Sequence, residues 1–168
     1  LAELEAEQIA LCRINDGACL NGKNPSVETG FHLGILKQRD DLNVVLHFQT
    51  VATAAVACHK TSEINFNLVP EIPYYIGEIG SVPFIVPGTP ALATAVVSAM
   101  SKYDLVIMVN HGVVVGGRDY QDVIEKALFF EMVCELLLKS GAVDPRPLTE
   151  TAVKHFLGER QKQKCEAV

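Results

Sequence analysis

Two long apolar runs dominate the pattern of hydrophobic and polar positions, one over residues 42–48 and one over residues 105–109. Both are rich in β-branched side chains and have almost no polar interruption, which is typical of strands buried on both faces. They predict strands over residues 42–48 and 104–110, and a shorter run over residues 113–115 resumes the extended pattern after Gly112. Three further short strands are predicted at residues 8–14, 64–69 and 82–86.

Predicted helices alternate with these strands. The clearest start signal is Thr89-Pro90, a capping hydroxyl followed by proline at the first helical position. Pro25-Ser26 gives a similar start, and Thr149 can cap a C-terminal helix. The predicted helices cover residues 25–38, 50–59, 90–101, 120–139 and about 152–157. The alternation predicts an α/β domain built as one sheet with helices packed on it.

Composition favours a single globular domain whose partner is a small molecule or a protein. With 168 residues and 49% apolar side chains, the chain can bury a sizeable core. The net charge is −6, and the only basic run is the short stretch 160–164, which argues against nucleic acid or an anionic membrane as a partner. No apolar run approaches the length of a membrane span, and the first residues lack the order of a secretory signal.

The five cysteines are Cys12, Cys19, Cys58, Cys134 and Cys165. Their number is odd, and they show neither a CxxC pair nor the spacing of a disulfide framework. We therefore expect a reducing, cytoplasmic location. The sequence starts at Leu1 without an initiator methionine and enters directly into a Leu/Glu-rich segment. We expect the natural protein to carry a further N-terminal part.

Three polar residues are candidates for chemistry: Glu28, His47 and His111. His47 ends the first long apolar run and His111 follows the second, and loops beyond strand ends commonly carry functional side chains. One such histidine alone is more often structural, but two of them favour a shared site. Glu28 lies in the first turn of a predicted helix, where the helix dipole favours an acid even without a function. The sequence contains no GxGxxG, P-loop or HExxH pattern, so these nucleotide and zinc-protease motifs give no support.

Four ordered motifs resemble the class II aldolase/adducin family. They are GKNPSVE with a later histidine, DLNVVLHFQ, VPGT and NHGV, at residues 22–32, 41–49, 86–89 and 110–113. The resemblance covers roughly residues 22–141 and is strongest to the aldolases for L-rhamnulose 1-phosphate and L-fuculose 1-phosphate. It implies a class II aldolase-like fold over residues 1–168, with helices on both faces of a central, mostly antiparallel sheet.

The resemblance also implies a divalent-metal site and a lyase reaction. The metal ligands of the family fall on His47, Gln49 and His111, the proton-transfer acid falls on Glu28, and a substrate-binding hydroxyl falls on Ser26. The implied reaction cleaves a phosphorylated ketose to dihydroxyacetone phosphate and an aldehyde. The implied cofactor is Zn²⁺ or another divalent metal, and the implied assembly is a homo-oligomer, a tetramer.

Two positions depart from the family pattern. Gln49 stands where the family has a second histidine, and a neutral amide oxygen is a poorer zinc ligand than imidazole. Val27 stands where the family has a second serine, which removes a hydroxyl that could face a substrate phosphate. The family's upstream phosphate-binding loop is also absent from the sequence. A related metal-dependent epimerase, dehydratase or decarboxylase therefore stays open, as does a non-catalytic, adducin-like interaction module.

Overall fold

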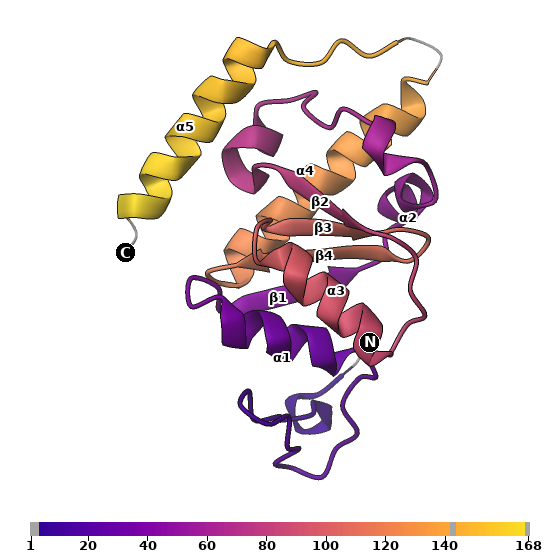
Figure 1. The fold of residues 1–168 in the computed structure, drawn as a ribbon, viewed down its shortest axis with the longest axis vertical. Helices are drawn as coiled ribbons and strands as arrows, with labels where there is room; N and C mark the ends of the chain where they lie inside the picture. The colour runs from indigo at the N-terminus through magenta and orange to yellow at the C-terminus, as the bar shows by residue number, and fades with distance from the viewer. Residues whose placement is uncertain (1–3, 142–143, 167–168) are drawn as a thin grey trace.

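A four-stranded sheet lies at the centre of the computed structural model, which describes residues 4–141 and 144–166. Its order is β1-β4-β3-β2, as Figure 1 shows. The strands are β1 (Val44–Phe48), β2 (Ile79–Val82), β3 (Leu105–Met108) and β4 (Gly112–Gly117). Strand β4 pairs antiparallel with β1 and β3, whereas β2 pairs parallel with β3. The sheet is mixed and mostly antiparallel, which confirms the predicted architecture.

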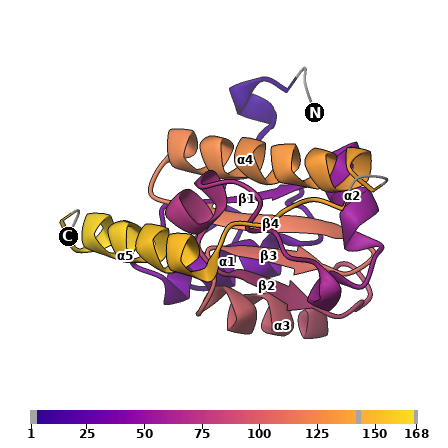
Figure 2. The same cartoon turned by 90° about the horizontal axis from the view of Figure 1, so that it is seen from above.

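Helices cover both faces of the sheet, as seen from above in Figure 2. One face carries α1 (Thr29–Gln38) and α3 (Pro90–Met100), and the other carries α2 (Val51–Ala57) and α4 (Tyr120–Lys139). The last helix, α5 (Glu150–Glu166), contacts the short helical turn η3 (Ile72–Ile76) and stands apart from the sheet in Figure 1. Two further short turns are η1 (Ala6–Gln8) and η2 (Thr61–Glu63). Within the described residues no helix has the length and apolarity needed to cross a membrane.

The two central strands are buried on both faces, as their unbroken apolar runs predict. Val106 and Val114 belong to the core under α1 and α3, whereas Ile107 and Val113 belong to the core under α2 and α4. Each of the four side chains is at most 1% exposed. Successive strand residues point to opposite faces, so both layers of helices need an apolar partner at every position.

Several predicted elements are confirmed with little change. The long helix over residues 120–139 is α4 itself. The Thr89-Pro90 start is also correct, because the Thr89 hydroxyl accepts a hydrogen bond from the Leu92 N–H and Pro90 is the first residue of α3. The first helix ends at Gln38 as predicted.

Two predicted strands are wrong in position or kind. Residues 64–69 form no strand, because Ile64 and Leu68 pack into the core under α2 and α4 without joining the sheet. The strand predicted over residues 82–86 lies earlier, at Ile79–Val82. It ends where Pro83 lacks an N–H to donate to the sheet.

The helix predicted from Pro25 begins at Thr29, because residues 26–29 form a turn closed by the Ser26 carbonyl. The strand predicted over residues 8–14 is reduced to an isolated bridge between Cys12 and Cys19. The C-terminal helix is longer than predicted, since residues 159–164 are strong helix formers and continue it past Gly158. The sheet of the described residues therefore has four strands, without the predicted strands at residues 8–14 and 64–69.

Candidate metal centre

Three of the predicted site residues, Glu28, His47 and His111, meet in space. Each offers a ligand atom, and these atoms all lie within 4.8 Å of one another. Glu28 Oε2 lies 3.3 Å from His47 Nε2, and Glu28 Oε1 lies 3.4 Å from His111 Nε2. The two imidazole rings stand nearly perpendicular, with their centroids 5.1 Å apart. The side chains are only 10–16% exposed, so the cluster is largely shielded from water.

The antiparallel pairing of β1 with β4 fixes the orientation of His47. His47 lies opposite Val114 in the register, and its Nδ1 is 3.0 Å from the Val113 carbonyl oxygen. A carbonyl can only accept, so Nδ1 carries the proton and donates it. The lone pair of the neutral ring is then on Nε2, the atom that faces Glu28.

A tight turn between β3 and β4 presents His111. Asn110 adopts a left-handed backbone with φ 57°, a conformation that asparagine tolerates better than most residues. Its N–H donates to the Ala57 carbonyl, and the His111 N–H donates to the Met108 carbonyl. Gly112 follows because a Cβ there would lie 2.7 Å from Gln49 Cγ and 2.9 Å from the Phe48 oxygen. Glycine directly after His111 is therefore a packing requirement of this turn.

Glu28 turns its carboxylate toward the histidines and does not cap α1. It occupies the N-cap position, yet its side chain makes no capping hydrogen bond. The turn before α1 holds its backbone, because the Glu28 N–H donates to the Ser26 hydroxyl at 3.2 Å and the Thr29 hydroxyl donates to the Ser26 carbonyl at 2.6 Å. The geometry thus favours a site residue over a helix-start charge.

All four sequence motifs converge on this region. The loop with Gly88 packs against the turn before α1, because a Cβ on Gly88 would lie 3.2 Å from Val27 Cβ. From α1, the buried Phe31 ring meets the edge of the His47 ring, with centroids 5.9 Å apart. Segments that are distant in the sequence therefore build one polar site against an apolar wall.

The donor set fits a divalent cation. Two imidazoles and a carboxylate are ligands that zinc and similar ions prefer. Two buried atoms of the cluster, Glu28 Oε1 and His111 Nδ1, have no hydrogen-bond partner among the described residues, and such polar atoms are costly unless something else satisfies them. Burial lowers the pKa of the His111 imidazole more than the charge of Glu28 raises it, and His47 lowers it further. A neutral imidazole is the form that binds a metal.

The two remaining predicted residues lie at the rim. Gln49 is exposed, and its Cγ packs beside Gly112, next to His111 in the chain. Ser26 is also exposed, and its hydroxyl accepts the Glu28 N–H. A metal-ligand role for Gln49 and a substrate-binding role for Ser26 stay predictions.

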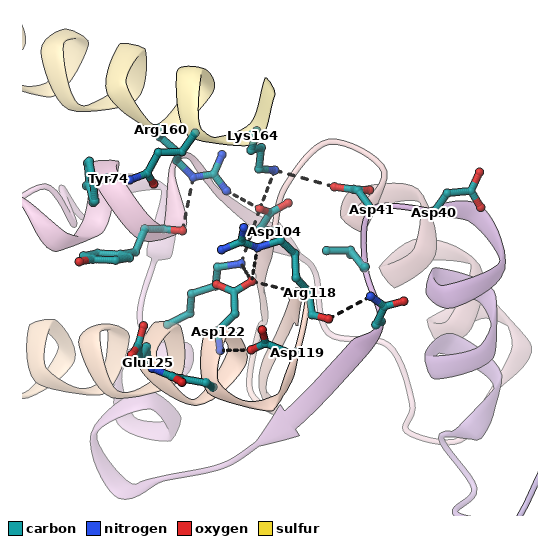
Figure 3. Close-up of a pocket in the computed structure, with 16 residues that line it drawn as sticks. Asp40, Asp41, Tyr74, Asp104, Arg118, Asp119, Asp122, Glu125, Arg160 and Lys164 are labelled. Carbon is teal, nitrogen blue, oxygen red and sulfur yellow. Dashed lines mark hydrogen bonds and ion pairs between the residues drawn. The ribbon is translucent and has the colours of Figure 1, made fainter. Parts of the chain in front are cut away.

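A second polar cluster lies at the opposite end of the same strands, and the sequence did not reveal it (Figure 3). Its centre is Asp104, which is 4% exposed and precedes β3. Four cations surround this carboxylate, from α1, α4 and α5: Arg39, Lys126, Arg160 and Lys164. Burial alone would raise the pKa of the Asp104 carboxyl, but Arg160, Lys164 and Arg39 together hold it well below its usual value. The cluster joins three helices to the sheet.

The chain belongs to a known family. The model of the Class II Aldolase and Adducin N-terminal domain matches residues 1–138, which confirms the resemblance drawn from the four motifs. Members of this family usually bind a divalent metal, and the cluster of Glu28, His47 and His111 provides a suitable site for one.

Curated relatives carry two kinds of name. The 3-oxo-tetronate 4-phosphate decarboxylase of Haemophilus influenzae is 28% identical over 157 residues, which cover 92% of this chain and 74% of the relative. The L-fuculose phosphate aldolase of Methanocaldococcus jannaschii is 32% identical over 124 residues, which cover 73% of this chain and 65% of the relative. The chain thus spans about two thirds to three quarters of the length of these relatives.

Solved structures agree on the fold. YgbL from Escherichia coli superposes with a TM-score of 0.86 at 22% identity, covering 92% of this chain and 75% of that structure. An L-fuculose 1-phosphate aldolase superposes with a TM-score of 0.80 at 20% identity, covering 95% of this chain and 75% of that structure. At such identities the likeness concerns the fold alone.

Proposed function

We propose that the protein is a metal-dependent carbon–carbon lyase that decarboxylates a phosphorylated 3-oxo sugar acid. The observation that carries the proposal is the Glu28 carboxylate, which lies between two imidazoles and has one buried oxygen without a hydrogen-bond partner in the described part of the chain. The similarity to a 3-oxo-tetronate 4-phosphate decarboxylase over 92% of the chain supports the choice of substrate. The aldolase reaction expected from the sequence becomes the second candidate.

The chemistry of the substrate explains why such a site is needed. In a 3-oxo acid the carboxylate is β to a ketone, so the bond to the carboxyl carbon can break with its electron pair moving to the ketone oxygen. Carbon dioxide leaves, and an enediolate remains whose oxygen requires a fixed positive charge nearby. A divalent cation bound by His47 and His111 would supply that charge.

Glu28 then has the task of moving a proton. As a neutral acid it donates its proton to the carbon that lost the carboxylate, which yields dihydroxyacetone phosphate from 3-oxo-tetronate 4-phosphate. The Val113 carbonyl keeps His47 in one tautomer, and the Ser26 turn keeps Glu28 beside both rings. The buried Phe31 ring contacts the His47 ring and forms an apolar wall on one side of the site.

Aldol cleavage is the second candidate, favoured by the 32% identity to an L-fuculose phosphate aldolase. Both reactions break a carbon–carbon bond next to a hydroxyketone phosphate and leave the same enediolate. They differ in the leaving part, which is carbon dioxide in one case and an aldehyde in the other. The same residues can therefore serve either substrate, and the assay must decide between them.

The test compares both substrates with one protein preparation. The protein is loaded with Zn²⁺, Mn²⁺ or Co²⁺ in turn, and formation of dihydroxyacetone phosphate is followed from 3-oxo-tetronate 4-phosphate and from L-fuculose 1-phosphate. Release of carbon dioxide from the first substrate, with little turnover of the second, is the expected result. Turnover of the sugar phosphate alone would replace the decarboxylase with the aldolase. Stoichiometric metal binding without turnover of either would favour a related metal-dependent epimerase or dehydratase, whereas the absence of both metal binding and turnover would favour the non-catalytic module.

A further inference from the structure

A small hairpin near the N-terminus places two cysteines opposite each other. The Leu20 N–H donates to the Leu11 carbonyl at 2.7 Å, and the Arg13 N–H donates to the Ala18 carbonyl at 2.9 Å. Between these two hydrogen bonds, Cys12 and Cys19 form an antiparallel bridge. Their spacing in the sequence gave no sign of this pairing, which depends on the turn between them.

The register makes this pair suitable for a disulfide. A pair of opposed residues with hydrogen bonds on both sides, but none between them, is the close type of antiparallel pair, with Cα atoms about 4.5 Å apart. Disulfides span Cα separations of about 4.4–6.8 Å. Opposed residues also project to the same face of the hairpin. A bond between Cys12 and Cys19 therefore needs side-chain rotation and little backbone movement.

Both thiols are free in this structure, and neither is fully buried. Cys12 is half-buried and Cys19 is exposed. The Cys19 thiol donates to the Lys23 carbonyl at 2.9 Å, a weak hydrogen bond that must break before Cys19 can turn toward Cys12. Lys23 lies in the segment that leads to Glu28, so oxidation would release a contact of that segment.

We propose that Cys12 and Cys19 form a thiol–disulfide modification site that reacts with a small-molecule disulfide such as oxidised glutathione. The Cys19 thiolate attacks one glutathione sulfur and releases the first reduced glutathione. The Cys12 thiolate then attacks Cys19 in the mixed disulfide, closes the bond between the two cysteines and releases the second glutathione. Two electrons pass from the cysteines to the glutathione disulfide, and the two thiol protons end on the released glutathione molecules.

The other cysteines are poorer candidates. Burial raises the pKa of the Cys134 thiol to about 12, so this thiol is inert near neutral pH. Cys58 and Cys165 are exposed, but no bridge joins either of them to another cysteine within the described parts of the chain. Only a cysteine with a neighbour in reach can convert a glutathione adduct into an internal disulfide.

The bond should be readily reversible. It would close only the short loop between Cys12 and Cys19, and a short loop removes less conformational freedom from the unfolded chain than a long one. Exposed disulfides of small stabilising effect are the ones that reducing agents open easily. A transient bond of this kind is compatible with the reducing compartment expected from the cysteine content.

The test uses the Cys58→Ser/Cys165→Ser variant, so that other exposed thiols do not contribute. After treatment with oxidised glutathione, the intact mass should fall by two hydrogen atoms, both Cys12 and Cys19 should resist alkylation, and dithiothreitol should reverse both effects. Adding Cys12→Ser should instead leave a stable glutathione adduct on Cys19. Peptide mapping of the oxidised wild-type chain gives the same information if the variant folds poorly.

Two results would overturn the proposal. One is a lasting glutathione adduct on Cys19 while Cys12 stays free to alkylate. The other is a dimer linked through these cysteines in place of an internal bond. The readout is mass, so it does not depend on the proposed lyase activity.

Discussion

At the scale of single residues, the proposed role of Glu28 is proton transfer, and its side chain makes no hydrogen bond that caps α1. Glu28→Gln should reduce turnover roughly 10²–10⁴-fold, because glutamine keeps the shape but cannot carry the proton. The thermal unfolding midpoint should change little, since the carboxylate makes no capping hydrogen bond. Steady-state kinetics on the active substrate and thermal melts measure the two effects. A variant that keeps most of the wild-type rate would show that another group moves the proton.

A second prediction at this scale concerns the proposed metal ligands. His111→Ala should abolish stoichiometric Zn²⁺ binding, whereas Gln49→His should tighten it by adding a third imidazole. Competition with a chromophoric chelator measures both affinities without any activity assay. The matched control is His59→Ala, because the His59 ring is exposed and contacts the carbonyl of Ala55 in α2, the helix that precedes it. Tight zinc binding that survives loss of both His47 and His111 would place the site elsewhere.

The sequence singled out Glu28, His47 and His111 as candidates, and the structure places them together, because each lies at a strong local signal. His47 and His111 stand at the ends of the two clearest apolar runs, and Glu28 stands at a helix start. What it could not find depends on the register between strands. The Val113 carbonyl that orients His47, and the pairing of Cys12 with Cys19, both follow from backbone hydrogen bonds between segments.

At the scale of elements, Asp104 fastens α5 to the rest of the fold. Arg160 and Lys164 of α5 both pair with this buried carboxylate (Figure 3). Asp104→Asn would remove the negative charge that pairs with these cations and leave them close together. We therefore expect the unfolding free energy to fall by about 3–5 kcal/mol. Urea denaturation measures it. Glu135→Gln is the control, because its pair with Lys139 is exposed and should contribute only about 0.3–0.5 kcal/mol.

The same carboxylate predicts a dependence on pH. The folded-state pKa of Asp104 is depressed below its ordinary value of 3.8, so the unfolded chain binds more protons in that range. The stabilising contribution is therefore present above about pH 4 and is lost as the pH falls further. Denaturation curves at descending pH should show a steeper loss for wild type than for Asp104→Asn. Parallel curves for the two proteins would contradict the assignment.

Elements were predictable where the local signals agreed, and uncertain where tertiary contacts decide. Helix α4 and the start of α3 follow from capping residues and apolar periodicity. The apolar run over residues 64–69 looks like a strand, yet its side chains fill the core as an irregular segment. An apolar run indicates that a segment is buried. Whether the buried segment also pairs with the sheet depends on neighbours that lie far away in the sequence.

At the scale of the whole molecule, the outer face of α4 is unusually apolar for a surface. Five side chains at four-residue steps, Tyr120, Ile124, Leu128, Met132 and Leu136, are between 38% and 76% exposed. Neighbours four residues apart touch on a helix surface, so the five side chains form one continuous row that is inclined to the axis of α4, and their exposure shows that the sheet does not cover them. Contiguous apolar surface of this kind marks an interface more often than free surface.

We therefore predict that the protein forms a homo-oligomer, a tetramer as the family resemblance implies, and that the row on α4 takes part in the contact. Closed assemblies of identical chains use self-complementary surfaces, and the inclined apolar row on a long helix can pack against the same row of a second copy. Light scattering after gel filtration should give a mass several times the 18.2 kDa of one chain.

The double variant Ile124→Lys/Leu128→Glu should lower this mass. The control Leu20→Lys changes an exposed apolar residue of the N-terminal hairpin and should leave the mass unchanged. A wild-type monomer at micromolar concentration would refute the oligomer, and an unchanged mass for the double variant would place the interface on another face.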